Sequence, residues 1–380
     1  LHYPLRRQRQ MCIRDSVLGV FSQLTFQQFV EVFRSAVMAW TTFDLVLIVS
    51  LMPILALCMK ETGMVSDLII NLRKVFSGRA VLVMLPAVMG ALPMPGGALL
   101  SAPLIDEEAD RLKLTGEERS FINVWFRHWN FFIYPLSSHL ILAASLAGVS
   151  LYELALIQVP PLILYLVLGY FASIRGINDD TTASQRRDLR TLLSIPLNTS
   201  PIILAVALNM VGMHMVAALL VGVASVLVFK KVSLNRTVSL FRQGFDWKLP
   251  LAIIGVMSLR RMIEYSGAVS AVLPYMKFTG MPNMMLLVAI GWAVGLSTAM
   301  PTAAMAVIFP MALVMMKEVT PILASILCLT TIFSYLISPM HLCLILTIEY
   351  FKAGLHAVYR KLIPASIATY VITITVAMLI

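Results

Sequence analysis

The sequence predicts an all-α polytopic membrane protein built from two inverted-topology repeats. Of its 380 residues, 59% are hydrophobic and only 13% are charged, and the mean hydropathy is +0.87. These values lie outside the averages for soluble domains, and apolar segments of spanning length recur between short polar loops. The two halves of the chain also resemble each other at a spacing of about 204 residues. Weak internal symmetry in an apolar chain is typical of secondary transporters.

Five short matches in the same order define the repeat. Met94-Pro95 returns as Met300-Pro301, and Leu140-Ile141-Leu142 returns as Leu344-Ile345-Leu346. The other pairs are Phe43-Asp44 with Phe245-Asp246, Gly63-Met64-Val65-Ser66 with Gly267-Ala268-Val269-Ser270, and Pro135 with Pro339. One such pair would be noise, but five at near-constant spacing are hard to obtain by chance. We therefore expect a first repeat over 17–174, a linker with one span over 175–213, and a second repeat over 214–380.

Apolar stretches of the chain predict the membrane spans in order. The expected spans are 44–59, 128–147, 154–174, 193–210, 214–229, 249–265, 325–350 and 363–380. Two further stretches, 80–104 and 285–313, are broken at their centres by Pro-Gly and Ser-Thr-Pro, and their short halves favour re-entrant helical hairpins. The span at 193–210 would invert the second repeat, so the hairpins would enter from opposite faces and meet near the midplane.

The first residues of the chain are expected to be foreign to the protein. Arg6 through Ser16 read RRQRQMCIRDS, which matches the translation of a transposase-type sequencing adaptor. We therefore interpret residues 1–16 as an adaptor artefact and Val17–Ser22 as the remainder of a truncated first span.

Loop charge predicts the orientation of the chain in the membrane. Lys and Arg gather in loops that would share one side of the bilayer: 60–79, 105–127, 175–192, 230–248 and 351–362. The positive-inside rule places that side in the cytoplasm, so we expect a multi-pass protein of the inner (plasma) membrane. The excess positive charge belongs to these loops and requires no nucleic-acid partner.

The hairpin tips are the first candidate for the substrate site. Met94, Pro95, Gly96 and Gly97 form a tip that cannot continue a helix, because Pro lacks an N–H and Gly tolerates positive φ. The free N–H groups and positive dipole of the following half-helix suit an anion. The second tip adds the hydroxyls of three residues: Ser297, Thr298 and Thr302. The alternative is a pair of Pro-kinked packing helices with ordinary capping hydroxyls.

Each hairpin is followed by a span that is broken at its centre. Ser137, Ser138 and His139 lie in the first break, and Ser338 and His341 lie in the second. Polar groups at membrane depth are costly, so the serines are expected to face a cavity and bind substrate. The two histidines are candidates for proton coupling, since imidazole titrates near neutral pH. Helix-to-helix hydrogen bonding is the alternative role of these histidines.

Other polar segments carry weaker signals. Arg127-His128 is expected at the cytoplasmic boundary as an interfacial anchor, with substrate contact as the alternative. The acidic run 106–110 is interpreted as a solvated helix cap. Cys58, Cys328 and Cys343 lie in apolar runs without C-x-x-C or metal-ligand spacing, so no metal site and no cofactor are predicted.

Three segments resemble a known membrane family. ALPMPGGALLSAP, the following NVWFRHWNFFIYPLSSHLIL and the preceding KETG are similar to the family known as domain of unknown function 401, placed in the ion transporter superfamily. The resemblance implies inverted repeats with re-entrant hairpins, an elevator-type movement, coupling to Na⁺ or H⁺, and a homodimer. The dicarboxylate carriers of that superfamily have Ser-Asn-Thr signatures at the tips, and neither tip here contains Asn, so their specificity is not carried over.

The functional prediction is an ion-coupled secondary transporter of a small solute, an organic or inorganic anion. A cation/proton antiporter is the alternative, although neither tip supplies the acidic residue that antiport normally uses. An intramembrane enzyme is a third class. The chain contains no HExxH, no G-x-S-x-G and no paired aspartates within a span, so we predict that it is not an enzyme.

Overall fold

The computed structural model describes most of the chain, and every regular element in the described ranges is a helix. Those ranges are 25–76, 78–92, 97–178, 189–266, 281–316 and 318–379. The predicted adaptor segment and truncated first span lie outside them. The chain divides into two compact units. Unit 1 comprises the chain up to Val49 with Ser138–Ile157 and Asp246–Met340, and unit 2 comprises Ser50–Ser137, Gln158–Phe245 and His341–Ile380.

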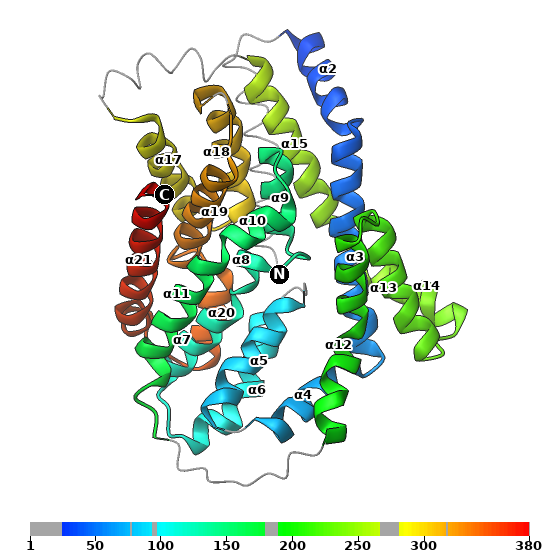
Figure 1. The fold of residues 1–380 in the computed structure, drawn as a ribbon, viewed down its shortest axis with the longest axis vertical. Helices are drawn as coiled ribbons and strands as arrows, with labels where there is room; N and C mark the ends of the chain where they lie inside the picture. The colour runs from blue at the N-terminus through cyan, green and yellow to red at the C-terminus, as the bar shows by residue number, and fades with distance from the viewer. Residues whose placement is uncertain are drawn as a thin grey trace. The chain divides into compact units, whose positions relative to one another are not determined.

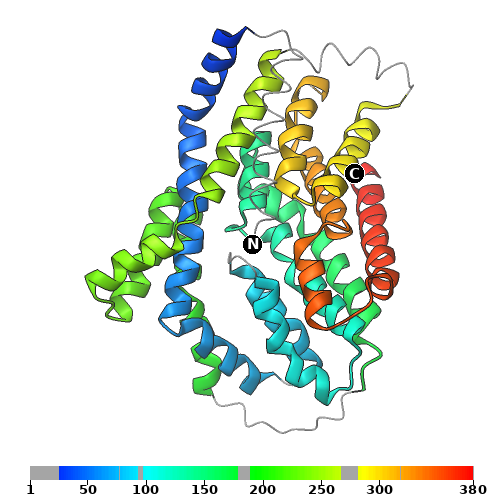
Figure 2. The same ribbon diagram turned by 180° about the vertical axis from the view of Figure 1, so that it is seen from behind.

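Unit 1 contains the second predicted hairpin. Its helices are α2 (Phe26–Val37), the first part of α3 (Trp40–Glu61), α9 (Ser138–Ala147), α10 (Leu151–Ile157), α15 (Lys248–Ser266), α17 (Asn283–Thr298), α18 (Pro301–Met316) and α19 (Pro321–Leu336). The hairpin arms α17 and α18 pack against each other and against α19, while α9 packs on α18 and α19. Figure 2 shows α2, in blue, beside α15, in yellow-green, in agreement with their contacts.

Helix α19 forms the core of unit 1. Nearly all of its side chains from Leu323 to Leu336 are buried, including its hydroxyl residues. The hydroxyls of Thr330, Thr331 and Ser334 donate to carbonyl oxygens three or four residues earlier in the same helix. Because each proton stays within the helix, a polar sequence can be buried at a low energetic cost.

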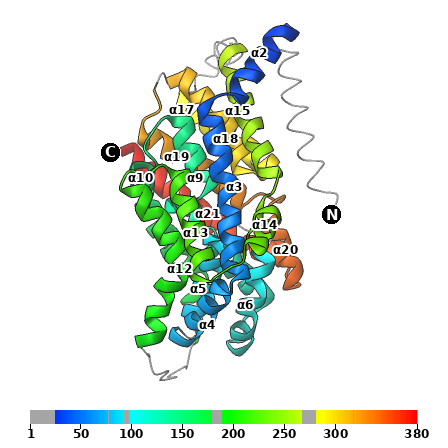
Figure 3. The ribbon, with the colours of Figure 1, turned by 90° about the vertical axis from the view of Figure 1, so that its right-hand side faces the viewer.

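Unit 2 contains the first predicted hairpin. Its helices are the rest of α3, α4 (Met64–Val75), α5 (Arg79–Ala91), α6 (Gly97–Arg111), α7 (Gly116–Arg127), α8 (Asn130–Ile133), α11 (Val159–Gly169), the π-helix η1 (Tyr170–Ile174), α12 (Leu189–Met210), α13 (Met215–Phe229), α14 (Leu234–Gly244), α20 (Leu342–Tyr350) and α21 (Leu355–Leu379). The arms α5 and α6 lie side by side and both contact α7 (Figure 1). Helix α12 packs on α13 and α4 (Figure 3).

Helix α7 occupies the centre of unit 2, and every side chain from Ser120 to Arg127 is buried. It is joined to α11 by a reciprocal pair of hydrogen bonds. Trp125 Nε1 donates to the Tyr165 carbonyl oxygen at 3.1 Å, and Tyr165 Oη donates to the Trp125 carbonyl oxygen at 2.6 Å. The two rings stack with their centroids 4.0 Å apart. Gly169 leaves room for the indole, because a Cβ there would lie 2.1 Å from Trp125 Nε1.

The helices of the described ranges include four that are long and apolar enough to cross a membrane. They are Trp40–Glu61, Gly116–Ala147, Thr191–Met210 and Leu355–Met378. The bent pair Leu151–Ile157 and Val159–Ile174 makes a fifth if the two helices form one span. Thr191–Met210 has a mean hydropathy of 1.7, yet only 17% of its most apolar 18-residue stretch is buried within the protein. Apolar helices with such exposed surfaces are typical of membrane proteins, whose side chains face lipid.

The repeat in the sequence extends to the helix boundaries. Arg79 and Asn283 begin the first arms of the two hairpins, 204 residues apart, and Gly97 and Pro301 begin the second arms at the same spacing. The central helices α7 and α19 start at Gly116 and Pro321, 205 residues apart. The central buried helices of the two units, α7 and α19, therefore occupy equivalent positions in the two repeats. Inversion of the two repeats across the membrane stays a prediction.

Candidate functional site

The tip of the second hairpin is a tight turn between α17 and α18. Helix α17 ends at Thr298, Ala299 adopts a left-handed conformation with φ 48°, and α18 begins at Pro301. Proline suits this first position because its missing N–H would have no partner inside the helix. The Ala299 N–H donates to the Gly295 carbonyl oxygen, which closes the end of α17. The predicted site residues Ser297, Thr298 and Thr302 thus flank one turn.

Hydroxyls at this tip donate their protons to backbone carbonyl groups. Ser297 Oγ and Thr298 Oγ1 both donate to the Val294 carbonyl oxygen, at 3.1 and 2.7 Å. Thr298 Oγ1 also accepts from the Met300 N–H at 3.3 Å. A hydroxyl whose proton is already donated offers only lone pairs to a further ligand, so these oxygens suit a cation better than an anion.

Thr302 differs from these residues in chemistry. It is half-buried in the first turn of α18, where backbone N–H groups have no partner within the helix. The next two N–H groups, of Ala303 and Ala304, both donate to the Met300 carbonyl oxygen. The Thr302 N–H and hydroxyl are therefore the donors that this tip presents to an anion, supported by the positive end of α18.

Ser338 connects the second helix break to the hairpin tip. Its side chain is fully buried, its Oγ donates to the Leu296 carbonyl oxygen at 2.7 Å, and the same oxygen accepts from the Met340 N–H at 3.2 Å. A residue predicted from the break is therefore bonded to the residue that directly precedes the predicted tip residue Ser297.

Two glycines bring α17 into close contact with α19. A Cβ on Gly291 would lie 2.7 Å from Thr330 Cγ2, and a Cβ on Gly295 would lie 1.9 Å from Ser334 Oγ. The segment 291–295 reads GWAVG, a G-x-x-x-G pattern of the kind that packs membrane helices closely. This G-x-x-x-G pattern, which was not among the predicted features, positions the tip against the buried polar face of α19.

His139 lies in the same unit, one residue into α9, and is 1% exposed. Its Nε2 is 3.0 Å from Thr331 Oγ1. Because the Thr331 hydroxyl donates to the Cys328 carbonyl oxygen at 2.8 Å, it can only accept from the histidine. The hydrogen-bond network therefore assigns a proton to His139 Nε2.

The first hairpin tip is described only in part. Met94, Pro95 and Gly96 lie outside the described residues, and Gly97 is the first residue of α6. Beyond the tip, the buried Asn123 of α7 donates through Nδ2 to the Ala98 carbonyl oxygen at 3.2 Å and to Thr347 Oγ1 at 3.1 Å. The start of α6 is thereby tied to α7 and α20.

Both helix breaks are closed by the same backbone turn. The Ser137 N–H donates to the Tyr134 carbonyl oxygen at 2.9 Å, and the Ser338 N–H donates to the Tyr335 carbonyl oxygen at 3.1 Å. Ser137 is 4% exposed, and the half-buried Ser138 begins α9. The turns thus align Ser137 with Ser338, 201 residues apart, whereas the Pro135 and Pro339 match has a spacing of 204.

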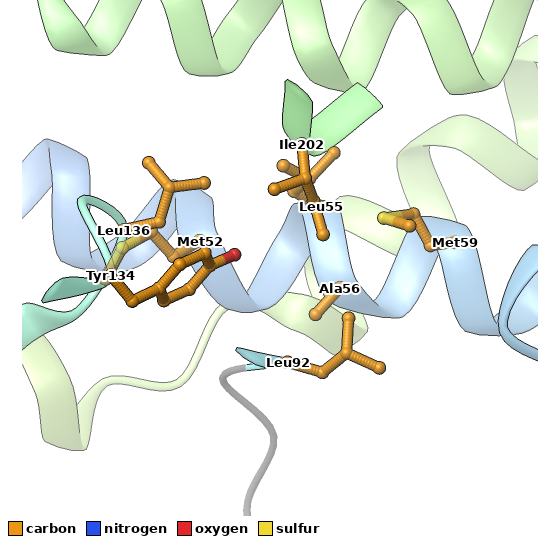
Figure 4. A pocket seen from close by; sticks show the side chains of 8 residues that line it. All are labelled: Met52, Leu55, Ala56, Met59, Leu92, Tyr134, Leu136 and Ile202. Carbon is orange, nitrogen blue, oxygen red and sulfur yellow. The ribbon is translucent and has the colours of Figure 1, made fainter. Parts of the chain in front are cut away.

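A narrow apolar cavity of unit 2 lies beside the first break (Figure 4). Its lining residues are Met52, Leu55, Ala56, Met59, Leu92, Tyr134, Leu136 and Ile202. The free volume is about 10 Å³, enough for roughly one water molecule. The Tyr134 hydroxyl is buried, and no group in the described part of the chain forms a hydrogen bond with it. In this conformation the cavity is too small for an organic solute.

The second histidine predicted for coupling, His341, lies in unit 2 and caps the N-terminus of α20. It is fully buried, and its ring meets the ring of His128 edge-on with the centroids 4.9 Å apart. Arg127 and His128 are only 8% and 3% exposed. The expectation that they form an exposed interfacial anchor was wrong, because α7 is enclosed by α5, α6, α20 and α21.

An all-helical membrane protein with two packed helical hairpins and two broken helices is the class that these observations define. The chain belongs to the family described as protein of unknown function DUF401, which matches residues 11–380. Among curated proteins, no match was found. A crystal structure of the Alcanivorax borkumensis YdaH transporter, described as having an unusual topology, is similar in fold with a TM-score of 0.65. That similarity covers 98% of this chain and 96% of the other at 13% sequence identity.

Proposed function

We propose that this protein is an ion-coupled secondary transporter that moves a small organic or inorganic anion across the inner membrane by an elevator-type mechanism. The fold similarity to a transporter and the exposed apolar helices support transport across a bilayer. In this proposal the two compact units are the bodies whose relative movement produces alternating access. The chain passes between them at both helix breaks, after Ser137 and after Met340.

The observation that carries the proposal is the bond from Ser338 Oγ to the Leu296 carbonyl oxygen. It places a broken helix against a hairpin tip, the arrangement in which transporters bind ions and substrate. In our proposal the lone pairs of Ser297, Thr298 and Ser338 ligate a coupling cation, Na⁺ in the first instance. The Thr302 N–H and hydroxyl, with the positive end of α18, bind the anionic group of the substrate.

The first hairpin has the matching role in this proposal. Met94, Gly96 and Gly97 supply free backbone N–H groups in this proposal, Pro95 interrupts the helix, and Ser137 and Ser138 supply hydroxyls at the first break. A homodimer in the lipid bilayer is the assembly that we propose by analogy with the superfamily. The proposed transport cycle requires no cofactor other than the coupling ion.

Coupling to protons in place of Na⁺ is the second candidate mechanism. His139 is 1% exposed and hydrogen-bonded to Thr331, so a change in its protonation would act directly on the core helix of unit 1. His341 is the corresponding candidate in unit 2. A cation/proton antiporter would use these imidazoles in place of the acidic residue that both tips lack.

The test is ligand-induced thermal stabilisation of the purified protein. Carboxylates and oxyanions are titrated with and without Na⁺ and at two pH values. Ion-coupled anion transport predicts a shift that needs both an anion and Na⁺ or low pH. A response to cations alone, without any anion, would favour antiport, and no response to either would overturn the proposal.

Two variants separate the proposed roles at the tip. Thr298→Val removes an acceptor oxygen, and we expect weaker Na⁺ dependence with the anion preference unchanged. Thr302→Val removes a donor, and we expect weaker anion binding with the Na⁺ response unchanged. Thr375→Val is the matched control, because its hydroxyl also donates to a carbonyl oxygen four residues earlier but lies exposed on α21. Equal effects of all three variants would contradict the assignment.

A further inference from the structure

Three potential metal ligands lie together in unit 2, and one of them, His341, is also the second candidate for proton coupling. One ring nitrogen each of His128 and His341 and the Sγ of Cys343 all lie within 4.8 Å of one another. Both histidines are buried, and Cys343 is half-buried. His128 is more than 200 residues from the other two in the sequence, so ligand spacing along the chain could not have indicated this cluster.

The end of α7 orients His128. The residue caps that helix, and its Nδ1 lies 2.6 Å from the Val124 carbonyl oxygen. A carbonyl oxygen only accepts, so Nδ1 carries the proton and Nε2 holds the lone pair. Metal-binding histidines usually donate their second nitrogen to such an acceptor, which fixes the tautomer and the ring orientation.

The start of α20 supplies the other two ligands. His341 is its N-cap, with extended backbone angles of φ −66° and ψ 106°, and Cys343 is the second residue of the helix. The turn into the helix brings these two side chains to the same place, although they are two positions apart. The edge-on contact of the His341 and His128 rings holds α7 and α20 together at this point.

We propose that His128, His341 and Cys343 form a binding site for a thiolate-seeking transition metal ion, Cu⁺ or Zn²⁺. Two imidazoles and a thiolate are soft and borderline ligands that select these ions over Na⁺, Mg²⁺ or Ca²⁺. On binding, the Cys343 thiol releases its proton to solvent and the thiolate coordinates the metal. Metal–ligand lengths of about 2.0–2.3 Å require ligand atoms roughly 3.3–3.8 Å apart, so the cluster must contract by about 1 Å. The half-buried Cys343 is the residue with room to move.

Local charge favours the monovalent ion. A thiolate with Cu⁺ is neutral, whereas a thiolate with Zn²⁺ leaves one positive charge beside the neighbouring Arg127, which is itself buried. Uncompensated charge is costly in a buried site. We therefore expect Cu⁺ to bind more tightly than Zn²⁺.

Direct metal binding to the full chain, purified without a polyhistidine tag, tests the proposal independently of transport. Co²⁺, as a spectroscopic substitute for Zn²⁺, should produce a thiolate-to-metal charge-transfer band at one ion per chain. Cu⁺ is titrated without oxygen against a chromophoric chelator, and we expect a Kd tighter than ~1 µM. Tighter Zn²⁺ than Cu⁺ binding would overturn the charge argument while leaving the site in place.

Cys343→Ser is the decisive variant, and it should abolish the band and weaken binding by at least ~100-fold. Cys343→His keeps three ligands, so it should retain Co²⁺ without the thiolate band. Cys328→Ser and His356→Gln are matched controls outside the cluster and should bind as the parent does. Thermal unfolding without metal establishes that each variant is folded. The site is disproved if the folded Cys343→Ser protein binds Cu⁺ and Co²⁺ like the parent, or if the parent binds neither.

Discussion

The hydroxyl of Ser338 donates a hydrogen bond of 2.7 Å to the carbonyl oxygen of Leu296, which lies 42 residues earlier in the chain. The bond joins the turn after α19 to the last turn of α17. Ser338 is fully buried, so water is not available to replace it. The bond therefore holds the helix break against the last turn before the hairpin tip.

Ser338→Ala should impair ligand binding more than it impairs stability. The substitution leaves the Leu296 carbonyl oxygen and the Met340 N–H without their hydroxyl partner, at a cost of about 1–3 kcal/mol. Ser173→Ala is the control, since that buried hydroxyl donates only to the Gly169 carbonyl oxygen of the adjoining helix. Thermal unfolding with and without ligand measures both effects. A similar loss of ligand-induced stabilisation in the two variants would contradict a specific role for Ser338.

Gly295→Ala should separate the hairpin from its buried neighbour. The new Cβ would lie 1.9 Å from Ser334 Oγ and 2.7 Å from Ser334 Cβ, so α17 must move away from α19. We expect the free energy of unfolding in detergent to fall by about 1–3 kcal/mol. Ser334→Gly in the same protein should restore part of that loss by removing both atoms.

Gly255→Ala is the matched control for this overpacking. Gly255 lies within α15, and a Cβ there would meet no heavy atom within 4 Å. Alanine has the higher helix propensity, so this variant should be neutral or more stable by up to ~1 kcal/mol. If both alanine variants behave alike, the close approach of α17 and α19 is not what holds the hairpin.

Local features of the fold could be predicted from the sequence because they depend on local chemistry. Pro301 lacks an N–H and suits the first position of a helix, so the start of α18 falls within the predicted tip. The predicted spans 214–229 and 249–265 correspond closely to α13 and α15, because their apolar length is itself the signal.

Packing partners could not be predicted in the same way. The contact of His128 with His341 depends on how α7 meets α20, and no local pattern encodes it. The direction of each hydroxyl bond at the tip was also hidden, because it depends on which carbonyl oxygen the helix turn presents. Gly291 and Gly295 were visible as a G-x-x-x-G pattern, but their partner helix was not.

Arg119→Lys should loosen the attachment of the first hairpin to α7. The guanidinium binds Asp106 at 2.8 Å and Asp110 at 2.6 Å, and its Nε donates to the Leu114 carbonyl oxygen at 3.0 Å. Lysine cannot reproduce this fork. Asp110 is largely exposed and contributes little, so we expect a loss of only about 1 kcal/mol, smaller in high salt.

Arg260→Lys is the control for this network. Arg260 pairs with Glu264 one turn away on the same helix, and such a pair is worth about 0.3–0.5 kcal/mol. Unfolding at ~0.05 M and ~1 M salt distinguishes the two variants. An Arg119→Lys effect no larger than that of Arg260→Lys would mean that the fork does not stabilise the fold.

A double-mutant cycle on Asn123 and Thr347 should reveal coupling between residues 224 positions apart in the chain. Asn123→Ala removes both bonds of its Nδ2, whereas Thr347→Val removes only the bond at 3.1 Å and leaves the Ala98 carbonyl oxygen as acceptor. Because both side chains are fully buried, we expect a coupling energy near 1 kcal/mol in thermal unfolding. Asn123→Ala with the exposed Thr375→Val should instead be additive. Additivity in both pairs would show that the hydrogen bond from the buried Asn123 amide of α7 to Thr347 of α20 contributes nothing measurable to stability.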